Sequence, residues 1–384
     1  MLSSSLARTR CSCLVRVSSR ALSTSSAPVA TLHPSQSGLA PPHLLTLADL
    51  SVPQIQTLIN NAVAFKKHYK SRAIPQAGRI AGAQFQQDGA DAKDAELVKS
   101  KSLDEKTVAF MFSKRSTRTR VSGETAVKLL GGAPMFLGSG DIQLGVNESL
   151  YDTSRVVSSM VDGILARVGH HSEVETLAKH STVPVINALS HLYHPLQILA
   201  DLQTLIELRT PFTTNLASLE GLTIAWVGDS NNILNEMMVT YPRLGVNLQI
   251  ATPEGYPLEQ EVLDRANEGL AKEGGKGKII HTHSPEEAVK GASVITTDTW
   301  ISMGQEEEAA KRMKDFAGYQ VTNDLLKRGG AASDAIFMHC LPRHKEEVDD
   351  EVFYGDKSVV FQEAENRKWT ALAVFDAFFG KWKL

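Results

Sequence analysis

Acidic residues are absent from the first 48 positions of the sequence, and the first one is Asp49. The same stretch holds four arginines among serine, alanine and leucine residues, namely Arg8, Arg10, Arg16 and Arg20. An N-terminus rich in arginine and serine and free of acids is typical of an organelle transit peptide, whereas a secretory signal needs a longer apolar core. We therefore expect residues 1–30 to be a mitochondrial transit peptide. A disordered tail with an accidental bias is the alternative.

Long apolar runs are also lacking. No stretch approaches the roughly 20 consecutive apolar residues that a membrane-spanning helix needs. Removing residues 1–30 takes away four arginines and no acid, which changes the formal charge from −3 to −7. That balance argues against nucleic acid as the main partner. We expect neither a membrane nor nucleic acid as a partner, and an anionic substrate would need a local basic site.

Cysteine is scarce in the chain. Cys11 and Cys13 lie in the expected transit peptide, which leaves Cys340 as one thiol and excludes an intrachain disulfide in the mature protein. No cysteine and histidine cluster has the spacing of a zinc site, so we expect no metal and no cofactor. Cys340 is then either a buried small hydrophobic residue or a functional thiol.

Apolar runs of strand length alternate with helix-length amphipathic stretches from residue 107 onward, which predicts parallel sheets covered by helices on both faces. Residues 84–105 have no clear period and are expected to form a surface loop or insertion. Strands are expected at residues 107–113, 135–137, 163–168, 183–188, 223–228, 246–251, 277–281, 292–297 and 335–339. Helices are expected at residues 52–70, 117–130, 148–161, 172–180, 194–209, 232–244 and 258–271, from 285, from about 349, and at 367–379.

The chain of 384 residues is longer than a single hydrophobic core usually supports, which predicts two domains. We expect an α/β fold in which each domain is a mostly parallel sheet flanked by helices, with long helices linking the two. The first domain is predicted to span residues 43–193 and to be completed by a C-terminal helix over 367–384. The second is predicted to span residues 194–366.

Residues 113–120 (SKRSTRTR) carry the sharpest chemical signal. They lie where a predicted strand ends and a helix begins, so the first backbone N–H groups of the helix are unpaired and its dipole adds partial positive charge. Serine and threonine hydroxyls and arginine guanidinium groups supply further donors. Together these groups predict a phosphate site. A solvated basic helix start is the alternative.

Four separated motifs resemble those of one enzyme family. Residues 116–120 (STRTR) are similar to the phosphate motif of the aspartate and ornithine carbamoyltransferases. Residues 194–197 (HPLQ) resemble that family's HPxQ, residues 298–304 (DTWISMG) resemble the DxxxSMG loop of its ornithine branch, and residues 339–342 match its HCLP. The motifs occur in the family's order, and the likeness runs from about residue 43 to the C-terminus.

The resemblance implies transfer of the carbamoyl group of carbamoyl phosphate to the side-chain amine of ornithine, giving citrulline and phosphate. It also implies a homotrimer in the mitochondrial matrix, with carbamoyl phosphate on the first domain and ornithine on the second. Rival functions are a carbamoyltransferase for aspartate, putrescine or an acylated ornithine, and a non-catalytic protein that binds carbamoyl phosphate. A nicotinamide dehydrogenase is a further rival because residues 228–232 (GDSNN) follow a strand, but they lack G-x-G-x-x-G.

Two candidate residues of the carbamoyl phosphate site can also be interpreted from their positions in the sequence. Arg167 ends a predicted buried strand, where α/β sheets bind ligands, although a strand-end ion pair is the alternative. His194 precedes Pro195 at a helix start and could donate to an oxyanion, or it could be a surface cap. The resemblance gives this site Ser116, Thr117, Arg118, Thr119, Gln143, Arg167, His194, Gln197, Cys340, Leu341 and Arg367. It gives catalytic roles to Cys340, Arg118, Arg167 and His194.

The ornithine site is expected on the second domain. By resemblance Asp298 pairs with the α-ammonium, and Cys340, as a thiol or a thiolate, lies beside the side-chain amine. A turn cap is the alternative role of Asp298, and Gly304 is a candidate hinge of the loop that follows it. Gln143 stands where the family places a residue that reaches a neighbouring subunit's site. The ornithine-binding residues are expected to be Asn232, Asp298, Ser302 and Met303.

Overall fold

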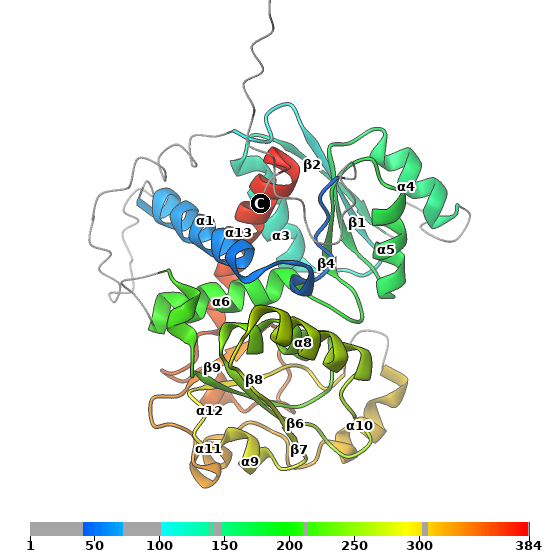
Figure 1. Cartoon of the computed structure of the whole chain (residues 1–384). Helices are drawn as coiled ribbons and strands as arrows, with labels where there is room; N and C mark the ends of the chain where they lie inside the picture. Colours follow the sequence, from blue (N-terminus) through cyan, green and yellow to red (C-terminus); the bar gives the residue numbers. More distant parts are fainter. Residues whose placement is uncertain are drawn as a thin grey trace, which may run out of the picture. The chain divides into compact units, whose positions relative to one another are not determined.

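The computed structural model describes residues 41–71, 101–138, 140, 148–209, 214–301, 306–382 and 384. All of them lie in one compact unit, Thr31–Leu384. Two parallel sheets, of four and of five strands, organise this unit, and helices cover both faces of each sheet (Figure 1). The expected α/β class with two helix-flanked parallel sheets is thereby confirmed.

The first sheet has the strand order β2–β1–β3–β4. Side chains alternate across a strand, so Val108 and Phe110 of β1 enter one apolar cluster while Ala109 and Met111 enter another. The strands are β1 (Thr107–Phe112), β2 (Ala133–Gly138), β3 (Gly163–Arg167) and β4 (Val185–Leu189). Helices α1 (Val52–Ser71), α3 (Thr117–Leu129) and α13 (Val360–Phe375) cover the first face, and α4 (Leu150–Ser158) and α5 (His171–His180) cover the second (Figure 1).

The second sheet has the strand order β7–β6–β5–β8–β9. Ile224 and Trp226 of β5 pack toward one face, and Ala225 and Val227 pack toward the other. The strands are β5 (Thr223–Val227), β6 (Asn247–Ala251), β7 (Ile279–Thr282), β8 (Val294–Thr297) and β9 (Ile336–His339). Helices α7 (Asn232–Thr240) and α8 (Gln260–Glu273) cover the first face. The second face is covered by α9 (Pro285–Val289), α10 (Ala309–Asp315), α11 (Asn323–Gly329) and α12 (Asp350–Phe353).

Two helices connect the sheets. α6 (Pro195–Arg209) follows β4, and α13 follows the strands of the second sheet and packs on α1, α3 and α6. A polar contact joins three of these helices, since Lys66 Nζ lies 2.6 Å from Glu207 Oε2 and 2.8 Å from Asn366 Oδ1. Residues far apart in sequence are therefore fixed against one another where the two sheets meet α6 and α13.

The predicted elements correspond closely to those observed, with one wrong boundary. All nine expected strands are present within a few residues of their predicted positions. The last helix begins at Val360 rather than near Arg367. The sequence did not indicate this start, because no residue there caps the helix with its side chain. It continues into a π-helical turn over Asp376–Lys381. Helices α10 and α11 were not predicted, since seven residues carry too little periodicity.

Some expectations fall outside the described residues. These are the transit peptide over residues 1–30, most of the expected loop at 84–105, and the side chains of Gln143, Ser302 and Met303. Short 3₁₀ segments at Leu47–Asp49, Leu216–Leu219, Pro242–Leu244 and Glu306–Glu308 complete the described secondary structure. Among the described helices, none combines the length and hydropathy needed to cross a membrane.

Close packing at the start of β3 yields a stability test. A Cβ added to Gly163 would lie 2.3 Å from Cδ1 of Phe379, a fully buried ring. We expect Gly163→Ala to lower the free energy of unfolding by about 1–3 kcal/mol through overpacking, measured by urea denaturation. Gly140→Ala is the control, because no atom of the described residues lies within 4 Å of a Cβ there. Equal denaturation midpoints for the two variants would contradict the packing.

Candidate active site

The loop after β1 and the start of α3 form a cluster of hydrogen-bond donors. Ser116 caps α3 by accepting a hydrogen bond on Oγ from the backbone N–H of Thr119, at 3.4 Å. The Ser116 hydroxyl also lies 3.0 Å from Oγ1 of Thr119. At the end of β1, the N–H of Ser113 donates to the carbonyl of Arg167 at 2.9 Å. The N-terminus of α3 is thereby held beside the carboxyl end of β3, where parallel sheets bind ligands.

Three guanidinium groups and an imidazole from four elements converge at this place. Arg118 lies on α3, Arg167 ends β3, Arg367 lies on α13, and His194 immediately precedes α6. Burial and then the charge of Arg118 lower the pKa of Arg167 and of Arg367 to about 10. Burial and the three guanidinium charges lower the pKa of His194 well below its usual range. At neutral pH Arg167 and Arg367 are therefore charged and His194 is a neutral imidazole.

Several polar atoms of this cluster are buried without a partner. Nε of Arg167, Nε of Arg367 and Nδ1 of His194 accept or donate no hydrogen bond within the described part of the chain. Arg167, His194 and Arg367 are only 7%, 4% and 3% exposed. Buried like charges and unpaired donors are costly. A small dianion bound among them would supply both the missing charge and the missing acceptors.

Gln197, in the first turn of α6, is held by three charged side chains. Its Nε2 donates to Asp201 Oδ1 and to Glu363 Oε1, each at 2.8 Å. Its Oε1 accepts from a terminal nitrogen of Arg367 at 2.6 Å. The other terminal nitrogen of Arg367 reaches Oγ1 of Thr119 at 3.4 Å. Helices α3, α6 and α13 are therefore joined by one buried polar network at the site.

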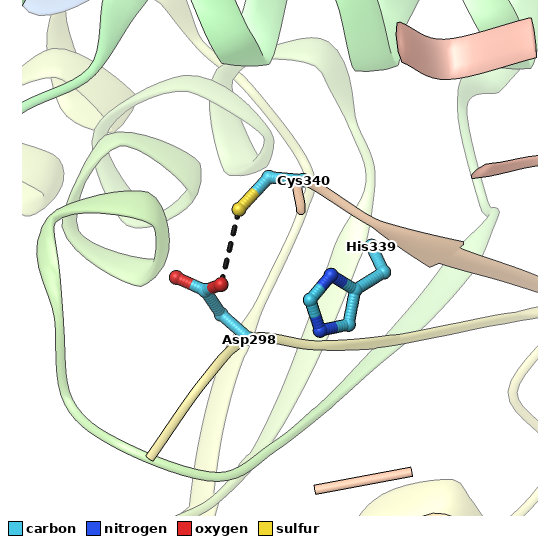
Figure 2. A group of neighbouring side chains, drawn as sticks. All are labelled: Asp298, His339 and Cys340. Carbon is cyan, nitrogen blue, oxygen red and sulfur yellow. Dashed lines mark hydrogen bonds between the residues drawn. The ribbon is translucent and has the colours of Figure 1, made fainter. Parts of the chain in front are cut away.

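A thiol and a carboxyl group lie on the second sheet, at the ends of the neighbouring strands β8 and β9 (Figure 2). The Cys340 thiol donates to Asp298 Oδ1 at 3.1 Å, and Asn231 Nδ2 donates to Asp298 Oδ2 at 2.9 Å. Burial and the charge of Asp298 raise the pKa of Cys340 well above its usual range. Burial raises the pKa of Asp298 as well. Cys340 is thus a neutral thiol here and not the thiolate that the resemblance left open.

Ligand atoms of Asp298, His339 and Cys340 lie within 4.8 Å of one another, a grouping that could hold a metal ion (Figure 2). Nδ1 of His339, however, already accepts from the N–H of Leu341 at 2.9 Å. Its Nε2 lies 3.3 Å from Glu347 Oε1. Because both ring nitrogens have partners inside the protein, we assign no metal ion to this group.

The start of α7 separates the roles of two adjacent asparagines. Oδ1 of Asn231 accepts from the N–H groups of Ile233 and Leu234 at 3.0 and 3.3 Å, so Asn231 caps the helix and its Nδ2 is free for Asp298. The predicted Asn232 instead donates from Nδ2 to the carbonyl of Ser190 at 2.7 Å. Asn232 therefore links the start of α7 to the end of β4.

Most of the predicted site residues come together in the structure. Leu341 joins them through its carbonyl, which accepts from a terminal nitrogen of Arg118, and Thr117 is the first, exposed residue of α3. Gln143, Ser302 and Met303 lie outside the described residues. Sequence reasoning missed Asn231, Asp201 and Glu363. The one available signal was the position of each acid four residues from a predicted site residue, Asp201 after Gln197 and Glu363 before Arg367.

The neutral state of Cys340 can be tested by alkylation. We expect Cys340 to react slowly with iodoacetamide at pH 8, because burial and Asp298 keep the thiol protonated. Asp298→Asn removes a charge that raises the pKa, so alkylation should become faster, by about tenfold for each pKa unit. Peptide mapping by mass spectrometry follows Cys340 apart from Cys11 and Cys13. A wild-type rate equal to that of free cysteine, or no acceleration in the variant, would contradict the assignment.

Comparisons with known proteins agree with this geometry. Residues 42–207 match the family described as "Aspartate/ornithine carbamoyltransferase, carbamoyl-P binding domain", and residues 220–378 match its "Asp/Orn binding domain". A mitochondrial ornithine carbamoyltransferase of Aspergillus terreus is 54% identical over 349 residues, which cover 89% of this chain and 90% of that protein. One from Aquarana catesbeiana is 53% identical over 272 residues, 71% of this chain and 75% of that protein.

Solved structures give the same result. The crystal structure of a mitochondrial ornithine carbamoyltransferase from Coccidioides immitis has a TM-score of 0.77 and 47% identity, and the match covers 89% of this chain and 99% of that one. The ornithine carbamoyltransferase from Pyrococcus furiosus has a TM-score of 0.75 and 40% identity, with 90% and 99% covered. The chain therefore belongs to the aspartate/ornithine carbamoyltransferase family, in its ornithine branch, as the four motifs predicted.

Proposed function

We propose that this protein forms citrulline and phosphate from carbamoyl phosphate and ornithine with the residues gathered between its two sheets. The observation that carries the proposal is the meeting of Arg118, Arg167 and Arg367, where Nε of Arg167 and of Arg367 and Nδ1 of His194 are buried without a partner and positive charge is in excess. A thiol–carboxyl pair suited to an amine lies close by, since Arg118 donates to the carbonyl of Leu341, the residue after Cys340. The four relatives compared with this chain are all named as ornithine carbamoyltransferases, which supports ornithine as the acceptor.

Carbamoyl phosphate binds first in this scheme. Its phosphate takes the N-terminal N–H groups and hydroxyls of α3 together with Arg118 and Arg167, because a helix start and guanidinium groups favour an oxyanion. Arg167, Thr119 and the one N–H of the neutral His194 are donors for the carbonyl oxygen. Gln197 Oε1 has a second lone pair besides the one used by Arg367, and this lone pair accepts from the carbamoyl NH2.

Ornithine then binds on the second sheet. Asp298 and Asn232 take its α-amino acid end, and Ser302 and Met303 close over it. The side-chain amine has an ordinary pKa of about 10.4, so it must lose a proton before it attacks. A neutral thiol and buried surroundings favour the uncharged amine. Attack joins nitrogen to the carbonyl carbon, and the oxyanion of the tetrahedral intermediate is held by the donors of the first sheet. Collapse of the intermediate re-forms the carbonyl and breaks the bond to the phosphate oxygen, and the departing phosphate takes the proton that the nitrogen loses.

Location and assembly complete the proposal. Relatives named as mitochondrial, together with the arginine-rich acid-free N-terminus, support a mitochondrial protein, and we place it in the matrix. We propose a homotrimer in which Gln143 reaches a neighbouring subunit's site. We further propose residues 43–193 with 367–384 as the carbamoyl-phosphate domain and residues 194–366 as the ornithine domain. Light scattering of the purified protein tests the trimer, and a monomer with full activity would exclude the role of Gln143.

Removing Arg118 tests the anion site. We expect Arg118→Leu to lower kcat for citrulline formation by about 10²–10³-fold, as the loss of one oxyanion donor does elsewhere. Lys128→Gln is the control, because it removes a positive charge from the exposed end of the same helix. Unchanged turnover in Arg118→Leu, or an equal loss in the control, would show that the anion binds elsewhere.

Substrate choice is tested by offering ornithine, aspartate and putrescine separately with carbamoyl phosphate. We expect phosphate release and citrulline with ornithine alone, because the Asp298 carboxyl group beside the Cys340 thiol suits an amine and not the second carboxylate of aspartate, and putrescine has no α-carboxylate. Product from another amine without citrulline from ornithine would overturn the substrate. Binding of carbamoyl phosphate without turnover would indicate a non-catalytic protein.

A further inference from the structure

A pair of buried acids, Asp201 of α6 and Glu363 of α13, lies behind the substrate-facing residues. They are 5% and 2% exposed. Each accepts one of the two hydrogens of the Gln197 amide at 2.8 Å. Glu363 also accepts the backbone N–H of His339 on its Oε2 at 2.9 Å. The pair therefore touches both the carbamoyl phosphate side of the site and the last residue of β9.

These two acids accept from the same amide nitrogen, so burial and their mutual repulsion favour one proton on the pair. Burial raises the pKa of both acids, that of Asp201 to about 7, and the charge of Asp201 raises the pKa of Glu363 further. Two adjacent carboxylates in a water-free interior cannot both be ionised easily. With one proton, the pair has a single negative charge that balances Arg367. The charges of Arg118 and Arg167 are then left for the substrate.

The pair also fixes which way the Gln197 amide points. Both hydrogens of Nε2 are used by the acids, and Oε1 therefore faces Arg367. If the amide turned over, its oxygen would meet two carboxyl groups and its nitrogen would meet a guanidinium. Oε1 is thus presented as an acceptor, which is the role that the carbamoyl NH2 needs in the proposed function.

Glu363 extends this order to the second sheet. Through the N–H of His339 it holds the end of β9, and the next residue is Cys340. Arg367 lies one helical turn after Glu363 on the same helix. One carboxyl group thus positions a guanidinium of the anion site and the strand end that carries the thiol.

We propose that Asp201 and Glu363 are positioning residues for carbamoyl transfer, a singly protonated acid pair that orients Gln197 and Arg367 and couples the carbamoyl phosphate site to the end of β9. The inference rests on the proposed function, because it presumes that carbamoyl phosphate occupies the arginine cluster. It differs from a merely structural role in predicting separate effects on the two substrates.

Replacements at the two positions should differ in a defined way. Asp201→Asn keeps the size of the side chain and provides a permanent hydrogen for Glu363, so we expect kcat/KM for carbamoyl phosphate to stay within about fivefold of wild type. Asp201→Leu leaves one Gln197 hydrogen unpaired and should lower it by about 10- to 100-fold. Glu363 accepts on both oxygens, and an amide has one acceptor oxygen. Glu363→Gln should therefore show the same loss and a raised KM for ornithine.

Two control variants separate positioning from stability. Glu365→Gln changes an acid on α13 that pairs with Lys70, and it should leave both KM values unchanged. Glu236→Gln changes a buried acid that is bound to Thr46 and Leu47, away from the site. It should lower the melting temperature without changing KM for one substrate more than for the other. If Asp201→Leu and Glu363→Gln lose stability yet keep the wild-type KM for both substrates, the acids are structural and the proposal is wrong.

The pH profile decides the question even if Asp201→Leu and Glu363→Gln do not fold. Loss of the shared proton adds a second negative charge beside Arg367, so kcat/KM for carbamoyl phosphate should fall as pH rises through that ionisation. The other ionisable groups that act on the pair are Arg367, Asp298, Tyr241 and Cys340, and all of them remain in Asp201→Asn. That variant should lack the decline. Identical profiles for the two proteins would overturn the shared proton, whereas a wild type without citrulline formation would instead refute the proposed function.

Discussion

An excess of buried positive charge is the constraint on which this site depends. Burial and the charge of Arg118 lower the pKa of Arg167 and of Arg367, and burial and all three guanidinium charges lower that of His194. A protein tolerates such a cluster when a ligand completes it. The binding of an anion is therefore part of the electrostatic balance of the fold and not an addition to it.

The arrangement of the chain makes this cluster possible. Parallel strands end at the same edge of a sheet, which brings Ser113 and Arg167 together across β1 and β3. Helix α13 then returns from the end of the chain to place Arg367 beside Thr119, 248 positions away in sequence. Rigid helices with buried faces hold these groups more firmly than loops would, as an oxyanion site requires.

The sequence predicted the strands because each is a continuous apolar run, and it predicted the phosphate site because STRTR lies at a strand-to-helix junction. It could not supply the partners that depend on tertiary packing. Asp201 and Glu363 look like ordinary acids on amphipathic helices until α6 and α13 come together over Gln197. The start of α13 was missed for a similar reason, since packing on α3 and α6, and not a cap, determines it.

The fixed orientation of the Gln197 amide affects which acyl phosphate the site accepts as a substrate. The remaining lone pair of its Oε1 selects a molecule that brings a hydrogen to that point. Acetyl phosphate has the same phosphate and carbonyl as carbamoyl phosphate but a methyl group in place of NH2. It would satisfy the arginines and still leave the second lone pair of this buried oxygen without a hydrogen, and hydrogen-bonding sites discriminate most strongly against ligands of that kind.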